Sequence, residues 1–378
     1  MSAPQVHGWC PSAYRPMMSG DGLVVRVRPW MGEINAAQIA ALCNAAKSFG
    51  NGSIDLTSRA NLQIRGVSEG DYPLLMDRLI EIGVVHANPL IEDRRTVIVT
   101  HDWIDGDLTH RLMTSLMDAL PRLPELPAKT GFALDTGRCS HLQSCSADFR
   151  IELTNDGRIL LRADGAAKGR IVAEDDVIEV LIEMVDWFVE TGGRDAGRMV
   201  RHLGRTLLPG IWLDAKPRQP HHTLEPGRNS KGQILGAPFG SLDSGALARL
   251  VSETGATAMR PMVNRLVLLM DANDVEAPDF ITNPDDPLLR VDTCTGTPGC
   301  PQALGPTRDV AKRLSAHMPA GKTLHVSGCQ KGCARPGASD VTVVAANGGF
   351  DLVTDGAAWD EPRQRGLSVD ALVKEISD

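Results

Sequence analysis

The sequence lacks any apolar run that approaches the roughly 18 residues needed to span a membrane. It also lacks, within residues 1–17, a basic segment followed by an apolar stretch, so we expect no secretory signal peptide. Both absences favour a cytoplasmic protein with no membrane partner. Disulfides are rare in that compartment, where clustered cysteines are more often metal ligands or redox groups. The positions of the 8 cysteines are therefore informative.

The chain has no excess of positive charge either. Its formal net charge is −8, which argues against nucleic acid as a partner. Lysine is scarce: 9 of the 39 basic residues are lysine, and the other 30 are arginine. A GC-rich genome would produce this bias, and so would a need for forked guanidinium donors that bind carboxylates or phosphates. Only the positions of the arginines can decide between these explanations.

An internal repeat organises the chain. Residues 22–67 have the pattern of a strand with alternating apolar and basic residues, a helix, and an extended segment with a polar interruption. Asn35 and Gln38 predict a capping box at the start of that helix. Residues 232–270 show the same order, and their last part, 258–270, has the pattern of one strand. Two copies of about 45 residues, this far apart, predict two half-domains that pair in space.

Further elements lie between and after the two copies. Helices are expected at about 108–120 and 173–191, where apolar residues recur along one helical face. Hairpins are expected at 149–165 and 339–356, each turned at an Asn- and Gly-containing segment. Residues 214–232 are polar and rich in proline, which is typical of a linker.

Four cysteines form two pairs near the end of the chain. Cys294 and Cys300 have the spacing C-x5-C, and after 28 residues Cys329 and Cys333 follow as C-x3-C. Four thiolates from two short loops can hold a tetrahedral zinc ion or a [4Fe–4S] cluster. The x5 spacing counts against a zinc knuckle. Pro301 predicts the first turn of a helix whose N-terminus would face an anionic cluster.

This cysteine pattern resembles that of the nitrite and sulfite reductase family, and the resemblance covers nearly the whole chain. It implies a mixed α+β and α/β fold in which two ferredoxin-like half-repeats pair into one domain, next to two α/β domains of the nitrite/sulfite reductase type. The second α/β domain would carry a [4Fe–4S] cluster on Cys294, Cys300, Cys329 and Cys333. We expect the limits to be 1–88 for the first half-repeat, 89–215 for the first α/β domain, 216–285 for the linker with the second half-repeat, and 286–378 for the cluster domain.

The family surrounds its bound anion with basic and polar side chains, and the resemblance implies which residues correspond here. The matching positions hold Arg59, Gln63, Arg65, Arg95 and Lys129. Two positions depart from the family pattern, since Ala60 replaces a glutamine and Gly131 stands where a second lysine would be. These losses imply that a small oxyanion is no longer the substrate.

Four segments resemble one branch of this superfamily more closely, the oxygenases of aerobic cobalamin synthesis. The segments are residues 10–29, 236–240, 280–294 and 324–337. The resemblance implies one [4Fe–4S] cluster, no resident siroheme, and a tetrapyrrole as substrate. Precorrin-3A would be hydroxylated at C20 with O2, and a γ-lactone would form. The implied partners are precorrin-3A, O2 and an external electron donor, either ferredoxin or reduced pyridine nucleotide acting through a reductase.

A protein of net negative charge needs local basic clusters to bind such a polycarboxylate. We expect Arg59, Arg95 and Lys129 to act in catalysis as well as in substrate binding. The expected substrate-binding set also contains Gln63, Arg65 and, from the second repeat, Arg260 and Arg265.

Insertion of oxygen needs a metal with a free position, which a four-cysteine cluster lacks, so we assign the cluster to electron transfer. A mononuclear non-haem iron, typically held by two histidines and a carboxylate, would suit the second role. The histidines available are His101, His110, His221 and His222, none of which shows a metal-site spacing. The stretch Cys139–Cys145, "CSHLQSC", looks like a metal motif. However, the resemblance implies no such motif, and Cys145 leads into a strand.

Two other functions remain open from the sequence. One is a siroheme-dependent nitrite or sulfite reductase, which would show an intense siroheme spectrum. The other is a tetrapyrrole carrier or cluster-bearing scaffold without enzymatic activity, which would not convert its ligand even when O2 and a reductant are supplied.

Overall fold

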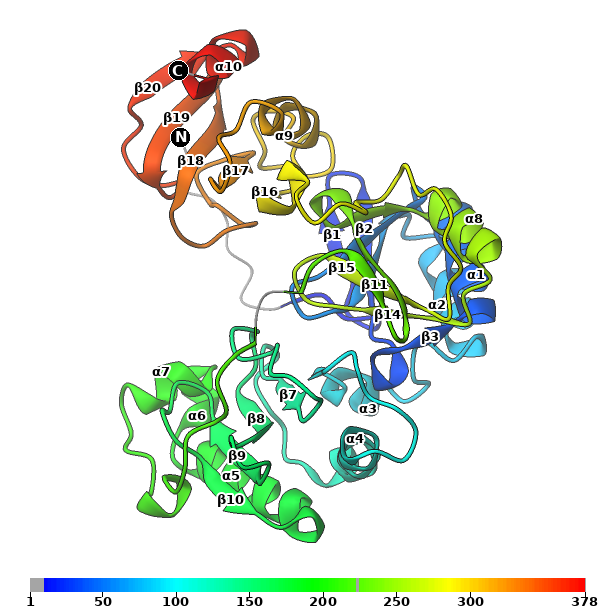
Figure 1. Ribbon diagram of the computed structural model, residues 1–378, viewed down its shortest axis with the longest axis vertical. Helices are drawn as coiled ribbons and strands as arrows, with labels where there is room; N and C mark the ends of the chain where they lie inside the picture. The colour runs from blue at the N-terminus through cyan, green and yellow to red at the C-terminus, as the bar shows by residue number, and fades with distance from the viewer. Residues whose placement is uncertain (1–9, 222–223, 378) are drawn as a thin grey trace.

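A computed structural model describes residues 10–221 and 224–377 (Figure 1). In these residues the chain forms four five-stranded sheets with helices packed against them. Among the described helices, none combines the length and apolarity that crossing a bilayer requires.

The two half-repeats each form one sheet. The first sheet contains, in order, β1 (Met17–Ser19), β2 (Gly22–Val27), β5 (Leu62–Val67), β4 (Ser53–Leu56) and β13 (Ser241–Asp243). The second contains β11 (Gly227–Asn229), β12 (Gly232–Gly236), β15 (Leu266–Met270), β14 (Ala258–Pro261) and β3 (Ile34–Asn35). Each sheet therefore takes its last strand from the other copy, through the antiparallel pairs β13–β4 and β3–β14.

Helices cover one face of both sheets, on the right in Figure 1. They are α1 (Ala36–Phe49) and α2 (Tyr72–Glu81) from the first copy and α8 (Ser244–Thr254) from the second. Leu42 of α1 and Leu247 of α8 belong to a single apolar core that includes strands of both sheets. The exchanged strands and the shared core join the two copies into one body, while the predicted domain limits stay a prediction.

The two copies agree in local detail. A 3-10 turn precedes the first helix of each, η1 (Trp30–Gly32) and η5 (Pro238–Gly240). The middle residues of these turns, Met31 and Phe239, have positive φ angles of 55° and 58°. At the start of α1, Asn35 and Gln38 form the predicted capping box.

Residues 258–270, predicted as one strand, form two strands. β14 and β15 are separated by a turn because Asn264 and Arg265 adopt positive φ angles of 60° and 63°. Arg265 therefore lies in a turn, as Ala60 does in the first copy, and not at a strand position like that of Arg65.

The third sheet follows the first half-repeat in the chain. Its order is β10 (Arg170–Val172), β9 (Ile159–Ala163), β8 (Phe149–Leu153), β7 (Phe132–Asp135) and β6 (Val97–Val99). The longer helices packed on it are α4 (Leu108–Ala119) and α5 (Val177–Glu190), as predicted within a few residues. Shorter helices are α3 (Pro89–Arg94), α6 (Gly193–Ala196), α7 (Met199–Leu203), η2 (Leu120–Arg122), η3 (Glu174–Asp176) and η4 (Gly210–Trp212).

The fourth sheet lies at the end of the chain. Its order is β16 (Val291–Thr293), β17 (Leu324–Ser327), β18 (Ser339–Ala346), β19 (Gly349–Gly356) and β20 (Gln364–Leu367), with η6 (Pro287–Arg290), α9 (Arg308–Ser315) and α10 (Val369–Ser377). The helix predicted at Pro301 is wrong: residues 301–302 form a turn, and the helix begins at Arg308. Gly305 and Pro306 intervene, and neither favours a helix interior.

Candidate functional site

Two parallel strands bring the paired cysteines to one edge of the fourth sheet. Cys294 directly follows β16, and Cys329 lies two residues beyond β17. Since these strands are parallel neighbours, their carboxyl ends meet at the same edge. Burial raises the pKa of Cys333, an effect that Lys331 opposes. The other three sulfurs, those of Cys294, Cys329 and Cys300, raise the same pKa, so the four thiols lie together.

A glycine lets the backbone approach the first of these sulfurs. The N–H of Gly328 donates to Cys294 Sγ over 3.2 Å. A Cβ at residue 328 would stand 2.8 Å from Ala303 Cβ and 3.4 Å from that sulfur, so a side chain would push the two loops apart. Hydrogen bonds to cluster sulfurs tune the potential of iron–sulfur centres. Four thiols on two loops, with such a bond already formed, fit a [4Fe–4S] cluster.

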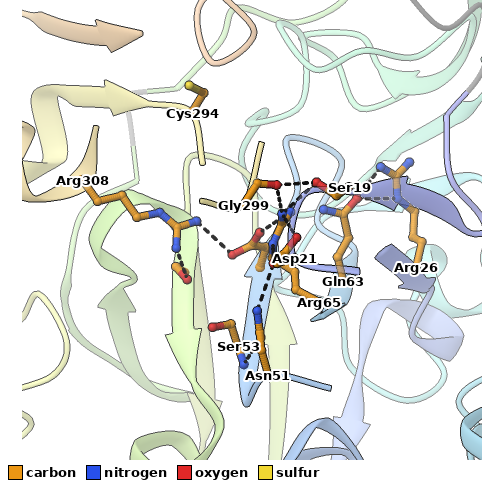
Figure 2. Close-up of polar contacts among 12 residues, drawn as sticks. Ser19, Asp21, Arg26, Asn51, Ser53, Gln63, Arg65, Cys294, Gly299 and Arg308 are labelled. Carbon is orange, nitrogen blue, oxygen red and sulfur yellow. Dashed lines mark hydrogen bonds and ion pairs between the residues drawn. The ribbon is translucent and has the colours of Figure 1, made fainter. Parts of the chain in front are cut away.

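The first sheet has a polar face opposite its core face. Val25 and Val27 of β2 belong to the apolar core. Side chains alternate along a strand, so Arg26 points to the other face. On β5 the same alternation places Gln63 and Arg65 on that polar face, between core residues. Figure 2 shows these three side chains together, on the side of the sheet where Cys294 lies.

Arg65 ties this polar face to the first cysteine loop. Its guanidinium group pairs with Asp21 at 2.9 Å and with Asp55 at 3.4 Å. It also donates to the carbonyl oxygen of Gly299 over 3.1 Å, directly before Cys300 (Figure 2). These contacts favour a role in holding the cysteine loop over the predicted role in substrate binding.

Three other arginines predicted to bind substrate are also paired with carboxylates. The pairs are Arg95–Glu92 (2.8 Å), Arg260–Glu33 (2.7 Å) and Arg265–Asp292 (3.5 Å). Arg260 further lies over the ring of Trp103, with its guanidinium carbon 3.8 Å from the ring centroid. Protein carboxylates already neutralise these cations, and their role toward a substrate stays a prediction.

Arg59 and Arg26 differ because their partners are neutral. Arg59 donates to the carbonyl oxygen of Lys129 at 2.7 Å and to Ser146 Oγ at 3.0 Å. Arg26 donates twice to Gln63 Oε1, at 3.2 and 2.6 Å (Figure 2). Neither arginine forms an ion pair with a carboxylate in the part of the chain that the structure describes.

Burial makes these two cations unfavourable without an anion. It lowers the pKa of Arg26 to about 10, and the nearby Arg28 adds to this effect. Burial likewise lowers the pKa of Arg59, with Arg198 as the next cause, and the nearby Cys10 and Asp148 oppose this effect only in part. A desolvated charge without a counter-ion costs free energy, so an anion bound beside these groups would be favoured.

A cavity of about 490 Å³ is lined by Arg28, which lies close enough to lower the pKa values of both Arg26 and Arg59, whereas these two arginines are not themselves part of its lining. Arg28 Nε and Thr130 Oγ1 belong to residues that line it, and among the described residues these buried atoms have no hydrogen-bond partner. Cys10 lines the cavity as well and lies close enough to influence the pKa values of Arg26 and Arg59. We call these five residues and the space between them the basic cavity.

Lys129 lies at the same place in the fold. Its carbonyl oxygen accepts a hydrogen bond from Arg59, and Lys129 directly precedes the cavity-lining Thr130 in the chain. Within the described residues its half-buried ammonium group makes no hydrogen bond or ion pair. Of the sequence-predicted set, Arg59, Gln63 and Lys129 therefore lie together, and Arg26 joins them.

Comparison with known proteins agrees with this architecture. Residues 15–82 match the family model of the nitrite/sulfite reductase ferredoxin-like half domain. A precorrin-3B synthase from a Sinorhizobium species is 30% identical over 384 residues, which cover 93% of this chain and 83% of the relative.

The chain belongs to the precorrin-3B synthase family.

More distant relatives place the precorrin-3B synthase family within the nitrite/sulfite reductase superfamily. The ferredoxin–nitrite reductase of Synechococcus elongatus is 24% identical to this chain, over 89% of it and 79% of the relative. Among solved structures, the NirA protein of Mycobacterium tuberculosis matches with a TM-score of 0.63 and 17% identity, over 94% of this chain and 79% of that protein. The last match shows a shared fold. The family membership predicted from sequence segments is thus confirmed.

In this member of the precorrin-3B synthase family, the two departures from the reductase pattern have structural correlates. A Cβ at Gly131 would lie 3.0 Å from Thr96 Cγ2 and 3.7 Å from Arg59 Nη1, so a lysine would not fit without movement. Ala60 packs with an apolar cluster that includes Val263. Neither position supplies a group that could bind a small oxyanion.

Sequence reasoning missed Arg26, although the signal was present. The alternation of apolar and basic residues in 22–29 indicated a strand, and it also implied that the basic residues share the face away from the core. The family motif contains other arginines and does not include Arg26.

Of the four histidines expected to be available for a second metal, His101 and His221 both lie next to a fifth, His141. His110 stacks on Trp103, and the ring centroid of His101 lies 5.6 Å from that of His141. His222 lies outside the described residues. His221 lies beside Cys139 and His141 instead. Cys145 is buried next to Arg150, and burial raises the pKa of its thiol to about 11.

Proposed function

We propose that this protein is a precorrin-3B synthase, an O2-dependent monooxygenase that hydroxylates precorrin-3A at C20 with γ-lactone formation in aerobic cobalamin biosynthesis. The observation that carries the proposal is the pair of guanidinium groups on the half-buried Arg26 and the buried Arg59, which have only neutral hydrogen-bond partners among the described residues. A polycarboxylate tetrapyrrole supplies the anions that such groups lack. The name of the relative at 30% identity supports the same substrate.

The residues of the chain would divide the work as follows. Arg59, Arg26 and the ammonium group of Lys129 would bind substrate carboxylates and orient the macrocycle against the polar face of the first sheet. Arg28 Nε and Thr130 Oγ1 would complete their hydrogen bonds with a ligand in the basic cavity. Arg65 would keep the cysteine loop fixed beside that face.

A [4Fe–4S] cluster held by Cys294, Cys300, Cys329 and Cys333 would supply electrons one at a time. The reaction needs two electrons and two protons for each O2, because one oxygen atom enters the substrate at C20 and the other leaves as water. An external donor, ferredoxin or a reductase that uses reduced pyridine nucleotide, would provide the electrons. Arg95, predicted as catalytic, is buried against Glu92, so we assign it a positioning role toward Arg28, whose carbonyl oxygen it binds at 2.7 Å.

A siroheme-dependent nitrite or sulfite reductase is the alternative, favoured by the relatives named ferredoxin–nitrite reductase. The absence of a side chain at Gly131 and the apolar packing of Ala60 count against it, because a small anion on siroheme iron needs close cationic or polar groups.

The decisive experiment is purification without oxygen, followed by iron and sulfide analysis, an absorption spectrum, and incubation with precorrin-3A, a reductant and 18O2. We expect broad cluster absorption without an intense siroheme spectrum, and a product that has gained one 18O atom. An intense siroheme spectrum together with nitrite or sulfite reduction would establish the alternative. Binding of precorrin-3A without conversion would indicate a carrier.

Replacing one cluster ligand tests the cysteine assignment. In Cys329→Ser, we expect cluster iron and sulfide to fall and hydroxylation to stop, because three thiolates hold the cluster poorly. The matched control is Cys43→Ser, since Cys43 is buried in the core of the half-repeats, far along the chain from the cluster loops. Full cluster content and activity in Cys329→Ser would contradict the assignment.

A further inference from the structure

A second group of ligand atoms lies away from the cluster cysteines. The sulfur of Cys139 and one ring nitrogen each of His141 and His221 all lie within 4.8 Å of one another. Ligands bound to one zinc ion at about 2.0–2.3 Å stand roughly 3–4 Å apart, so small side-chain movements would close this group around an ion. Among the described residues it is the group whose geometry suits a single metal ion.

The loop that carries two of these ligands is held from within. It follows β7, whose last residue, Asp135, accepts hydrogen bonds from Ser140 Oγ at 2.6 Å and from the backbone N–H of Leu142 at 3.1 Å. The backbone N–H of His141 donates to the same carboxylate at 3.3 Å. Both neighbours of His141 and His141 itself are therefore fixed relative to the sheet.

The segment that carries the third ligand is tied to this loop. The backbone N–H of His221 donates to the carbonyl oxygen of Ser140 at 2.9 Å. Arg218 donates to the carbonyl oxygens of Gly137 at 2.9 Å and Arg138 at 3.2 Å. Gln143 Nε2 donates to the carbonyl oxygen of Arg218 at 2.5 Å. These backbone contacts place the linker against the loop without any help from a metal ion.

A cavity of about 440 Å³ lies at the same place. His141 and His221 line it, together with Val263 and Asn264 from the turn between β14 and β15. The first α/β domain, the linker and the second half-repeat thus meet around these ligands. Three protein ligands beside a cavity are typical of metal sites that keep one position open, whereas structural zinc sites are closed by four.

The donor set selects the kind of ion. One thiolate and two imidazoles suit borderline divalent ions such as Zn²⁺ or Fe²⁺, and they do not suit Mg²⁺ or Ca²⁺, which prefer oxygen. We propose that Cys139, His141 and His221 bind one divalent transition-metal ion, with an open coordination position facing the adjoining cavity. This site uses none of the four cluster cysteines, and its argument does not depend on the proposed reaction.

The test is metal analysis of the whole protein with its cluster in place. A [4Fe–4S] cluster contains equal numbers of iron and sulfide, so the acid-labile sulfide measures the cluster iron. We expect each wild-type chain to hold about one zinc or iron atom in addition to that cluster iron. Cys139→Ser, His141→Ala and His221→Ala should each lose that atom while sulfide content and cluster absorption stay unchanged. His110→Ala and Cys145→Ala are the matched controls, and both should keep it.

A titration with Co²⁺ supplies a direct probe after mild chelator treatment. Thiolate-bound Co²⁺ should give a charge-transfer band that requires Cys139, and His221→Ala should weaken Co²⁺ binding roughly 100-fold or more. Circular dichroism identifies any variant that fails to fold, and the exposed His221 is the safest position to change. Zinc or iron that disappears in all three variants supports the site and identifies the ion. Metal retained in the variants, or wild-type protein with neither extra metal nor a Cys139-dependent band, would overturn it.

Discussion

The first and second half-repeats share a backbone plan but differ on the outer faces of their sheets. In the first sheet Arg26 stands opposite Gln63 across β2 and β5. In the second sheet Gly236 stands opposite Leu266 across β12 and β15. The outer face of the second sheet carries an apolar cluster of Ile234, Met262, Leu266 and Leu268, beside the buried Arg260, which stands opposite Leu268 and is neutralised by Glu33.

The difference shows that one architecture supports either a mainly polar or a mainly apolar outer face. Gln63 of β5 corresponds to Leu266 of β15. Two residues further along each strand, Arg65 of the first copy corresponds to Leu268 of the second. The inner faces remain alike, since both sheets contribute to the same apolar core. Sequence divergence on the outer face therefore decides which half-repeat contacts the loop between Cys294 and Cys300.

The largest effect is expected when an arginine, as found on the outer face of the first sheet, replaces an apolar residue on the outer face of the second sheet. In Leu268→Arg a fully buried side chain becomes a cation with no carboxylate placed for it. We expect a loss of about 3–5 kcal/mol in the free energy of unfolding, measured by urea denaturation. Leu268→Met keeps the volume and should cost less than about 1.5 kcal/mol. A loss below about 1 kcal/mol for the arginine would mean that this face is not a closed core.

The reverse exchange, Arg65→Leu, should cost somewhat less. It leaves Asp21 and Asp55 without their arginine, but Arg308 still pairs with Asp55 at 3.2 Å. We expect a loss of about 3 kcal/mol and faster release of cluster iron to a chelator, because the Gly299 carbonyl loses its charged donor and keeps only Ser19 Oγ and the N–H of Gly20. Unchanged iron release would show that Arg65 does not hold the cysteine loop.

Arg59 and Arg265 provide a comparison between the turns of the two copies. Arg59→Ala should weaken precorrin-3A binding about 10- to 100-fold, since a hydrogen bond to a charged group contributes about 1.5–3 kcal/mol, while cluster absorption stays intact. Arg265→Ala should leave the affinity unchanged, because its donors are taken by the carbonyl oxygens of Leu289 and Val291. Equilibrium binding provides the measurement. Equal losses of affinity for precorrin-3A in both variants would contradict the predicted difference between the two copies.

The smallest effect concerns Arg26 and depends on pH. Its pKa is lowered to about 10 in the folded protein, well below the ordinary value of an arginine, so the protonated form is less favourable there than in the unfolded chain. The resulting cost is complete below about pH 10 and fades as the pH rises above that value. The free energy of unfolding of Arg26→Gln should therefore equal or exceed that of the wild-type protein at about pH 7. The difference between the two proteins should shrink above about pH 10.

Urea denaturation at the two pH values provides the measurement, with the exposed Arg249→Gln as control. A clear loss of stability in Arg26→Gln at neutral pH would mean that Arg26 is well compensated in the ligand-free protein, and the argument for a bound anion would lose its main support.

Local pattern made much of the fold predictable. The capping box at Asn35, the helices near 108–120 and 173–191, and both hairpins depend on neighbours along the chain, and the structure has them close to the predicted limits. The strand over 258–270 was wrong, because positive φ at two non-glycine residues leaves no mark in the apolar pattern. The helix at Pro301 was wrong because a favourable first residue does not outweigh Gly305 and Pro306 shortly after it.

The candidate site was predictable where spacing carries the information. C-x5-C and C-x3-C indicated four ligands, since the cysteines of each pair are neighbours in sequence as well as in space. The arginines were predictable only as a set. Whether a guanidinium group meets a carboxylate, such as Asp21 or Glu33, or a neutral group such as Gln63 depends on residues that can lie far away along the chain.

The sequence by itself determined the two half-repeats, the two cysteine pairs and the family, because these are recorded in periodicity, spacing and local motifs. Only the tertiary structure decided which arginines are neutralised and that His221 joins Cys139 and His141. The physical reason is that charge compensation and metal geometry act over a few ångströms of space. Sheet pairing and the linker bring those groups together from distant parts of the chain.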